Sequence, residues 1–350
     1  MFKGKRFLST MLTALVLSIS LCAANVQAAS VTRIDGGAGG RIGTANKVAS
    51  DLFGKSSNVI LVNGYGYADA VSATPLAKQL NAPVLLTAGG STLEAEVLNT
   101  MQNLGASNVY IVGGTGVVSP SIETKLKASY KVERIAGITD TSRMGTNAEV
   151  AKKVLSLSGK KGAVLVNGQD GYADALSVAS IAAQKGYPVL FGTSKTVAAA
   201  VKDIITSNSL SILAVGGEGV LPQAVVSSVG GTKITQNTPD RFATNLAVLN
   251  YFKGADGLDF SNVYVAAGGA ADDQFADALI ASAAAAKTGS PLVLSGAGAN
   301  KSQIAKAQDY ILTNVKDTSK VVIIGGTASV SDSIKDSIQT EGGLEVISIE

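Results

Sequence analysis

A threefold internal repeat constrains this chain of 350 residues more than any other feature. An aromatic-Ala-Asp-Ala motif occurs three times, with its aspartates at Asp69, Asp174 and Asp277, which are 105 and 103 residues apart. Each time, an apolar run of strand length ends at a glycine, and the aspartate follows just before an apolar helical pattern. This period is too long for a solenoid unit, so each copy can hold a small domain of its own.

Within the first copy, short apolar runs alternate with longer segments of helical periodicity, which is typical of βαβ units. The strands are apolar throughout, so both faces of the sheet should be buried, as in parallel sheets, with right-handed crossovers. We therefore expect an α/β fold of three tandem, three-layer parallel-sheet domains. The expected strands are 31–34, 58–62, 83–87 and 108–112, and the expected helices are 43–53, 68–80, 93–104 and 120–129.

The first 28 residues are expected to be a secretory signal peptide. A basic start (Lys3, Lys5 and Arg6) precedes a long apolar run, and Val26-Gln27-Ala28 fits a small-residue cleavage site. A retained membrane anchor is the alternative, because the run approaches the roughly 20 residues that span a bilayer. The repeats then predict three domains, at residues 30–130, 131–230 and 231–350.

Composition excludes several classes of function. The full chain has 29 basic and 26 acidic residues, and removing a signal with three basic residues leaves 26 of each, so nucleic acid is not an expected partner. The chain has no histidine, and its one cysteine, Cys22, lies in the signal. Nucleophilic triads with histidine, histidine or thiolate zinc sites and disulfides are therefore excluded. No dinucleotide or P-loop fingerprint occurs, so we expect no enzyme activity, no cofactor, no metal and no membrane contact after signal removal.

An arginine recurs at the start of a helical pattern in each copy, and a threonine follows three positions later. The threonine can cap the helix. An arginine beside a helix N-terminus forms an anion site, and its planar fork suits phosphate or carboxylate. A salt bridge to a carboxylate across a domain contact is the alternative. The residues are Arg41 with Thr44, Arg143 with Thr146, and Arg241 with Thr244.

Aspartates and glycines complete the candidate polymer-binding set. Asp69, Asp174 and Asp277 can contact a ligand or simply complement the dipole of a first helical turn. Glycines that end strands permit either a close ligand approach at the carboxyl edge of the sheet or a tight turn. Asp272-Asp273 has no counterpart in the other copies and is interpreted as a solvated loop. The candidate glycines are Gly64 and Gly168, and the pairs Gly113-Gly114, Gly216-Gly217 and Gly325-Gly326.

Taken in order, these motifs resemble the clostridial-type cell-wall-binding repeat, type 2. The resemblance rests on Arg-Ile, the arginine–threonine spacing, Asn-Gly before Tyr-Ala-Asp-Ala, Pro-Val-Leu-Leu and Val-Gly-Gly, and it covers all three copies. It implies secretion by a Gram-positive bacterium and Rossmann- or toprim-like domains packed about a pseudo-threefold axis. It also implies non-covalent attachment to anionic wall polymers of the teichoic-acid kind, through inter-domain grooves that contain Arg41, Arg143 and Arg241.

The third copy departs from the family pattern. It has Lys233-Ile234 in place of Arg-Ile and Ala267-Gly268 in place of Asn-Gly, which leaves open whether it binds polymer or only closes the ring. After its Gly-Gly pair, only a last helix and a closing strand at 344–349 are expected, with no effector domain.

The sequence therefore predicts a monomeric, non-enzymatic protein of the cell wall or cell surface that holds an anionic polymer. Peptidoglycan and other wall proteins are further candidate partners. One alternative is a surface-layer or matrix component that acts by self-association. Another is a metal-dependent phosphodiester hydrolase using Asp69, Asp174 and Asp277, although each copy offers only one recurring acidic ligand.

Overall fold

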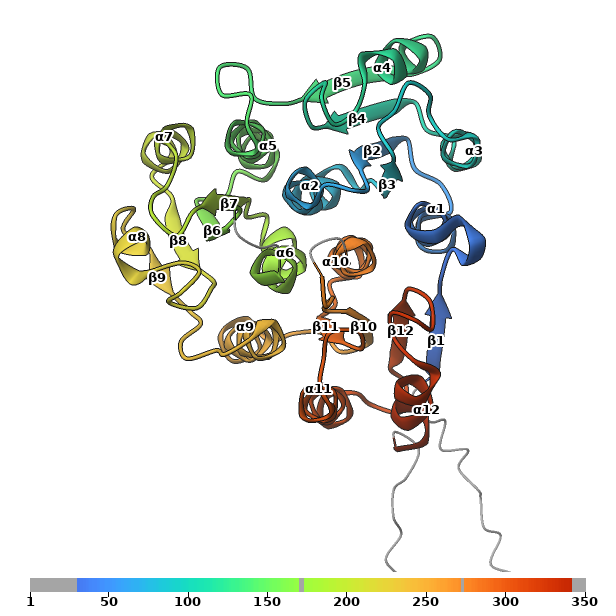
Figure 1. The fold of residues 1–350 in the computed structure, drawn as a ribbon, viewed down its shortest axis with the longest axis vertical. Coiled ribbons are helices and arrows are strands. Elements are labelled where there is room, and N and C mark those ends of the chain that lie inside the picture. The colour runs from blue at the N-terminus through green and yellow to red at the C-terminus, as the bar shows by residue number, and fades with distance from the viewer. Residues whose placement is uncertain (1–29, 170–172, 272–273, 342–350) are drawn as a thin grey trace, which may run out of the picture.

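The computed structural model describes residues 30–169, 173–271 and 274–341, and in these ranges the chain forms three four-stranded sheets arranged as a ring (Figure 1). All strand pairs within the sheets are parallel. The expected α/β fold of three tandem parallel-sheet units about a pseudo-threefold axis is confirmed. Four expected features lie outside the described residues, namely the signal at 1–28, Tyr172, Asp272-Asp273 and the closing strand at 344–349.

The three sheets share one strand order, in which two central strands lie between two edge strands. The first sheet runs β3 (Val84–Thr87), β2 (Asn58–Asn63), β4 (Asn108–Val112), β5 (Lys131–Ile135). The second runs β7 (Val189–Gly192), β6 (Gly162–Asn167), β8 (Ser211–Ala214), β9 (Thr232–Lys233). The third runs β11 (Leu292–Ser295), β10 (Asn262–Ala267), β12 (Lys320–Ile324), β1 (Ser30–Ile34).

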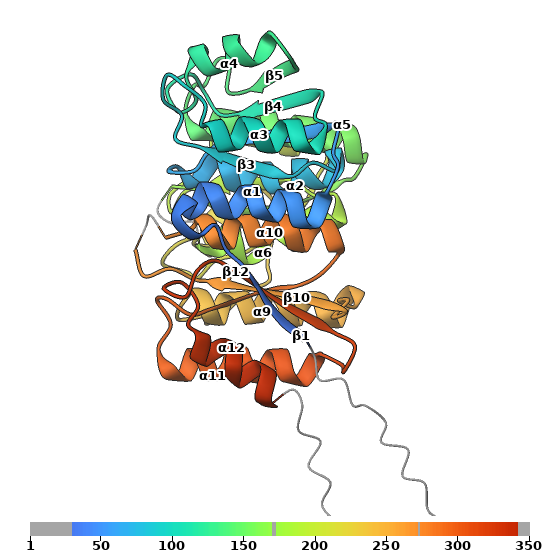
Figure 2. The ribbon, with the colours of Figure 1, turned by 90° about the vertical axis from the view of Figure 1, so that its right-hand side faces the viewer.

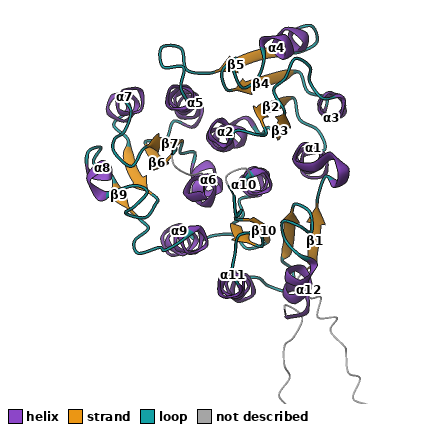
Figure 3. Ribbon diagram, viewed as in Figure 1, coloured by secondary structure: helices purple, strands orange, loops and turns teal. Residues whose placement is uncertain are grey.

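Helices cover both faces of each sheet, which gives the three layers seen in Figure 3. One helix of each unit lies towards the axis: α2 (Tyr67–Leu80), α6 (Ala173–Lys185) and α10 (Ala276–Thr288). A second helix joins neighbouring units: α1 (Gly40–Phe53), α5 (Arg143–Ser158) and α9 (Arg241–Asp256). The outer helices are α3 (Ala95–Leu104), α4 (Pro120–Lys127), α7 (Ala199–Asn208), α8 (Gln223–Ser227), α11 (Lys301–Asn314) and α12 (Asp332–Glu341).

Each sheet takes its last edge strand from the beginning of the next sequence copy, which the repeat pattern does not reveal. β5 completes the first sheet and β9 completes the second. The ring closes because β1, the earliest described strand, pairs with β12, so that Ser30 stands beside Lys320 and Ile34 beside Ile324. Neighbouring units are therefore joined by backbone hydrogen bonds as well as by side-chain packing.

A basic residue fastens each of these edge strands to the preceding unit. The Arg33 guanidinium donates to the carbonyl oxygens of Gly325 and Val330, at 2.8 and 2.7 Å. In the same way, Arg134 donates to Gly113 O at 2.8 Å and Lys233 to Leu221 O at 2.6 Å. The side chains of Arg33, Arg134 and Lys233 are 11%, 13% and 6% exposed and also pair with Asp332, Glu123 and Glu218. The lysine of the third copy thus performs the structural role of the two arginines.

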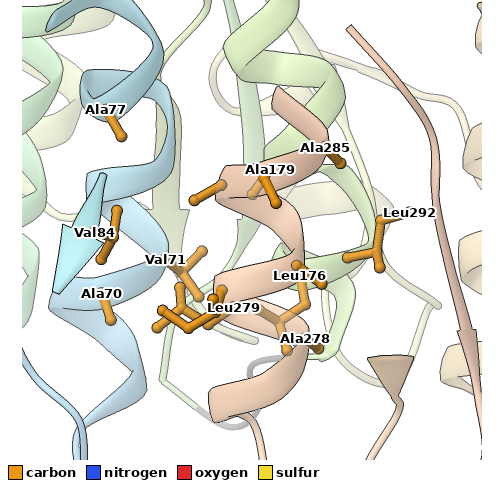
Figure 4. Close-up of a cluster of buried hydrophobic side chains, with 14 of the residues drawn as sticks. Ala70, Val71, Ala77, Val84, Leu176, Ala179, Ala278, Leu279, Ala285 and Leu292 are labelled. Atoms are coloured by element: carbon orange, nitrogen blue, oxygen red, sulfur yellow. The ribbon is translucent and has the colours of Figure 1, made fainter. Parts of the chain in front are cut away.

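The three central helices pack directly against one another along the axis, as seen end-on in Figure 1 and from the side in Figure 2. Val71, Leu176 and Leu279, each two residues after its motif aspartate, meet between these helices in Figure 4 and are fully buried. Their neighbours are mostly alanine and serine, which allow close helix approach, and a helix apolar on all sides belongs in the interior. Burying each of the three larger side chains contributes about 1.5–3 kcal/mol.

Candidate functional site

The three candidate arginines perform the same local role in each copy. Each lies in the first turn of its helix, and its Nη1 donates to the carbonyl of the glycine turn that follows the central strand. Arg41, for example, lies in the first turn of α1 and binds the glycine that follows β2. The contacts are Arg41 to Gly64 O at 2.8 Å, Arg143 to Gly168 O at 3.3 Å, and Arg241 to Gly268 O and Gly269 O at 2.8 and 3.0 Å.

Each aspartate interacts with the arginine of the following copy, in cyclic order around the ring. The Arg143 charge acts on Asp69, the Arg241 charge on Asp174, and the Arg41 charge on Asp277. Burial at the start of a central helix raises the pKa of all three carboxyl groups, and for Asp69 the pKa rises to about 6. The neighbouring arginine opposes this effect by stabilising the ionised form. The carboxylate that the sequence offered as the alternative partner of each arginine therefore lies close enough for its charge to interact with that arginine.

The threonines were expected to cap the helices, and this expectation is wrong. The N-cap positions belong to Gly39, Ser142 and Asp240, and the side chains of the latter two accept the capping hydrogen bonds. The threonines lie one turn further in and are buried. The hydroxyls of Thr44 and Thr146 accept from the backbone N–H of Gly36 and Gly137, at 3.0 and 3.4 Å, and Thr244 hydrogen-bonds to Asp174. Thr44 and Thr146 therefore hold the loop before their helix, and Thr244 contacts the motif aspartate of the preceding copy.

The glycine pairs divide into one packed and one open residue. A Cβ on Gly113, at φ +125°, would lie 2.8 Å from Asp69 Oδ2, and one on Gly325, at φ +108°, would lie 2.2 Å from Asp277 Oδ2. Gly216 contacts Asp174 in the same manner. By contrast, nothing lies within 4 Å of a Cβ built on Gly114 or Gly326. The first glycine of each pair therefore packs against the aspartate. The second is open in the first and third copies, whereas a Cβ on Gly217 would lie 3.5 Å from Thr238 O.

Aromatic side chains lie beside Arg41 and Arg143, and the sequence motifs gave them no role. The Arg41 guanidinium carbon lies 4.6 Å from the Tyr65 ring centroid, and that of Arg143 lies 5.3 Å from the Tyr67 centroid. Tyr67 also meets Phe275 edge-on, with centroids 6.1 Å apart. Tyr65 is 61% exposed, so one aromatic face remains open to a ligand. The aromatic position before Ala-Asp-Ala was the available signal for Tyr67 and Phe275.

Two cavities contain matching sets of the candidate residues, each set drawn from two copies. The cavity between the first and second copies, of about 540 Å³, is lined by Asp69 and Gly114 from one side and Arg143 and Thr146 from the other. The cavity between the third and first copies, of about 520 Å³, is lined by Asp277 and Gly326 and by Arg41 and Thr44. We call these the inter-repeat grooves. The corresponding set of the second and third copies is Asp174, Arg241, Thr244 and Gly217, and the structure does not describe residues 170–172, which directly precede α6 in the sequence.

The candidate metal-dependent hydrolase requires acidic ligands gathered at one point. Asp69, Asp174 and Asp277 each start a different central helix and each face a different arginine. Within the described ranges, no group of three or more acidic, histidine or cysteine side chains is arranged to hold a metal ion. In the same ranges, no helix combines the length and apolar character needed to cross a membrane.

Comparison with known proteins identifies the same three segments. The family model described as cell wall binding domain 2 (CWB2) matches residues 33–123, 134–226 and 237–335. The chain is 33% identical over 325 residues to the N-acetylmuramoyl-L-alanine amidase LytC of Bacillus subtilis (strain 168), which covers 92% of this chain and 60% of that protein. It is 28% identical over 306 residues to the Amidase enhancer of the same organism, covering 86% of this chain and 39% of that protein. The chain thus spans at most three fifths of these relatives.

Solved structures show the same architecture. Cwp6 from Clostridium difficile superposes with a TM-score of 0.76 at 24% identity, covering 90% of this chain and 48% of that one. Cwp8 from the same organism gives a TM-score of 0.74 at 28% identity, covering 90% and 52%. The ring of three parallel-sheet units is therefore shared with Cwp6 and Cwp8.

Proposed function

The chain belongs to the cell wall binding domain 2 family, and from that premise we propose that it is a secreted, non-catalytic protein that holds an anionic, teichoic-acid-like wall polymer in its inter-repeat grooves. The observation that carries the proposal is the repeated assembly of an arginine, an aspartate and an open glycine backbone from two adjacent copies. Anchoring at the cell wall or surface follows from this activity.

The groove chemistry suits a polymer that alternates phosphate groups with polyol or sugar units. The guanidinium of Arg143 or Arg41 provides a planar donor pair for phosphate oxygens. The carboxylate of Asp69 or Asp277 accepts hydrogen bonds from hydroxyl groups, and the exposed Tyr65 ring offers a flat apolar face to a sugar. The open backbone at Gly114 lets the chain of the polymer approach closely.

Weak contacts at several grooves are sufficient for firm attachment. Each hydrogen bond between a charged guanidinium and phosphate contributes about 1.5–3 kcal/mol. Simultaneous binding of one polymer at both grooves adds avidity of about 10²–10⁴ over a single groove. A protein of zero formal charge after signal removal can therefore hold a polyanion, because the positive charge is placed locally. Binding should weaken as salt increases.

The amidase activity that one relative's name states is not part of the function proposed for this chain. LytC is by name an amidase, and the chain matches 60% of its length. We propose that the shared part is the wall-binding part and that the chain itself cleaves no wall bond. Incubation of the purified protein with walls should release no soluble peptidoglycan fragments, and release that depends on protein concentration would contradict this assignment.

The test of polymer binding is co-sedimentation of the purified protein with isolated cell walls, before and after the acidic polymers are stripped. We expect binding to be lost after stripping and reduced at least tenfold by Arg41→Ala combined with Arg143→Ala. The matched control is Lys47→Ala with Lys125→Ala, which removes the same charge from exposed positions outside both grooves and should bind normally.

Two further outcomes decide the assignment. Replacing both arginines with lysine keeps the charge, so intermediate binding by a folded variant supports recognition by the planar fork. Unchanged binding to stripped walls would instead move the ligand to peptidoglycan or protein. Ordered self-assembly without walls, and no wall binding, would replace the proposal with the self-associating surface component.

A further inference from the structure

A smaller cavity lies at the opposite end of the central helices from the two grooves. It has a volume of about 260 Å³ and is formed where the C-terminal ends of α1, α2 and α10 meet. The grooves contact the first turns of α2 and α10, whereas this cavity contacts their last turns, about 20 Å away for a helix of this length. Its lining therefore comes from the first and third copies only. The lining residues are Phe53, Ala77, Lys78, Asn81, Ala82, Ala283 and Lys287.

Two lysines share this cavity, and none of the described residues that line it is acidic. The Lys78 ammonium donates to the main-chain oxygen of Lys287 at 3.2 Å. The Lys287 ammonium donates to Asn81 Oδ1 at 3.2 Å and lies 4.2 Å from the Phe53 ring centroid. Both hydrogen-bond acceptors are neutral. An ammonium group has three donors, so each lysine can still donate to a ligand in the cavity.

The charges of the two lysines repel each other, and no acidic side chain among the described residues that line the cavity offsets this repulsion. Burial lowers the pKa of Lys78, and the positive charge of Lys287 lowers it further. Both lysines stand in the last turn of their helices, where the helix dipole favours positive charge. That effect explains one lysine per helix, but it does not explain why two of them converge on one cavity.

The remaining central helix, α6, does not take part in this convergence of lysines. The last turn of α6 also carries a lysine, Lys185, which lies 5.3 Å from the Phe252 ring centroid in α9 and outside the cavity. Lys287 and Phe53 of α1 form the equivalent pair. Lys78 instead reaches across to α10 and joins Lys287. Convergence of two lysines is thus a feature of the contact between the third and first copies.

We propose that Lys78 and Lys287 form a site for a phosphate group, separate from the inter-repeat grooves. Ammonium groups are compact point charges that suit phosphate oxygens. The volume is below the roughly 300 Å³ at which pockets for drug-sized ligands begin, so the site takes a phosphate or a short phosphate ester. Because the two lysines come from the two copies that close the ring, the bound anion ties that contact together.

The experiment measures thermal unfolding of the purified protein with increasing inorganic phosphate at pH 7, against chloride at equal ionic strength. A ligand that binds only the folded state raises the unfolding temperature. We expect phosphate to do so and Lys78→Gln with Lys287→Gln to weaken phosphate binding by about tenfold or more per lysine. Lys185→Gln is the control from the last turn of the remaining central helix and should retain the full response.

A glycerophosphodiester is tested in parallel. Stabilisation by inorganic phosphate alone assigns the site to a free anion, and stabilisation by both assigns it also to a phosphodiester such as a polymer unit. An equal response to phosphate in the wild type and the double lysine variant overturns the site, as does no response beyond that to chloride. The double lysine variant should co-sediment with cell walls as the wild type does, because neither lysine lines a groove, so this result is independent of wall binding.

Discussion

The Arg143 guanidinium donates a 2.8 Å hydrogen bond to the Tyr67 hydroxyl, so a side chain of the second copy is held by one of the first. The Tyr67 hydroxyl in turn donates to Gln169 O at 3.0 Å. The arginine is therefore positioned before any ligand arrives. A side chain that is already ordered loses less conformational entropy on binding, which favours the groove between these copies as a polymer site.

The buried carboxyl group of Asp69 should make stability depend on pH. Burial raises its pKa from 3.8 to about 6, so between these values the folded protein keeps a proton that the unfolded chain releases. The contribution of this group is fully present below about pH 4 and is lost as pH rises through 6. Relative to Asp69→Asn, the free energy of unfolding of the wild type should therefore fall by up to about 3 kcal/mol between pH 4 and 7. Urea unfolding at several pH values measures this difference.

Asp140 provides the control with the opposite sign. Hydrogen bonds from Ser142 lower the pKa of Asp140, so its contribution is lost as pH falls rather than as it rises. An Asp69→Asn protein whose pH profile is parallel to that of the wild type would contradict the burial of this carboxyl group.

The two members of a glycine pair should respond differently to alanine. Gly113→Ala places a Cβ 2.6 Å from Val117 Cγ2 and 2.8 Å from Asp69 Oδ2, at φ +125°. We expect this strain to lower the free energy of unfolding by about 1–3 kcal/mol. Gly114→Ala meets nothing within 4 Å, so it should fold normally and weaken only wall binding. Denaturant unfolding together with co-sedimentation separates the two effects, and equal destabilisation of both variants would disprove this division of roles.

Arg33 should be required for ring closure. Arg33→Ala leaves the carbonyl oxygens of Gly325 and Val330 without its hydrogen bonds, which should reduce the free energy of unfolding by about 1–3 kcal/mol. Arg33→Lys should recover part of this loss, because Lys233 occupies the same place in the second sheet. The control Lys47→Ala removes only an exposed pair with Asp51 and should change stability by less than about 0.5 kcal/mol. Equal stabilities of the Arg33 and Lys47 variants would contradict the role of this contact.

Removing a buried hydroxyl from a central helix should change stability by an amount that depends on whether the hydroxyl is hydrogen-bonded. Ser72 donates to Ala68 O and accepts from Asn147 Nδ2, at 3.1 and 2.9 Å. Ser72→Ala leaves Asn147 without that acceptor and should cost about 1–2 kcal/mol. Ser282 is fully buried, and its hydroxyl has no hydrogen-bond partner among the described residues. Ser282→Ala should therefore be neutral or stabilise by up to about 1 kcal/mol, and thermal unfolding of both variants provides the comparison.

Local sequence signals predicted the elements of the first copy well. The expected helix at 68–80 is observed as Tyr67–Leu80, and the expected strand at 108–112 as Asn108–Val112. Apolar periodicity and glycine breaks decide such elements because they depend on near neighbours. The sharing of edge strands could not be predicted in this way. The buried side chains of Val31 and Ile34 show that their strand packs against the core, but burial does not show which strand it pairs with.

The candidate site was predicted in its residue types more than in its arrangement. The recurring arginines and aspartates stand where the motif suggested, at the starts of their helices. The sequence did not show that each arginine faces the aspartate of the preceding copy, because that relation depends on how the copies pack. It also did not distinguish Gly113 from Gly114, since only the first has a backbone conformation and a neighbouring carboxylate that exclude a side chain.

The pairing of β1 with β12 has a consequence for how the chain reaches its native state. Ser30 finds its hydrogen-bonding partner only when Lys320 is available, so the ring cannot close while the polypeptide is still emerging. Bringing such distant segments together carries the largest loop-closure entropy in the molecule, and contacts of this kind form slowly. Until then, one edge of β12 is an unpaired template for any extended strand. Assembly of the third unit is therefore the stage at which this protein is most exposed to mispairing with a neighbour.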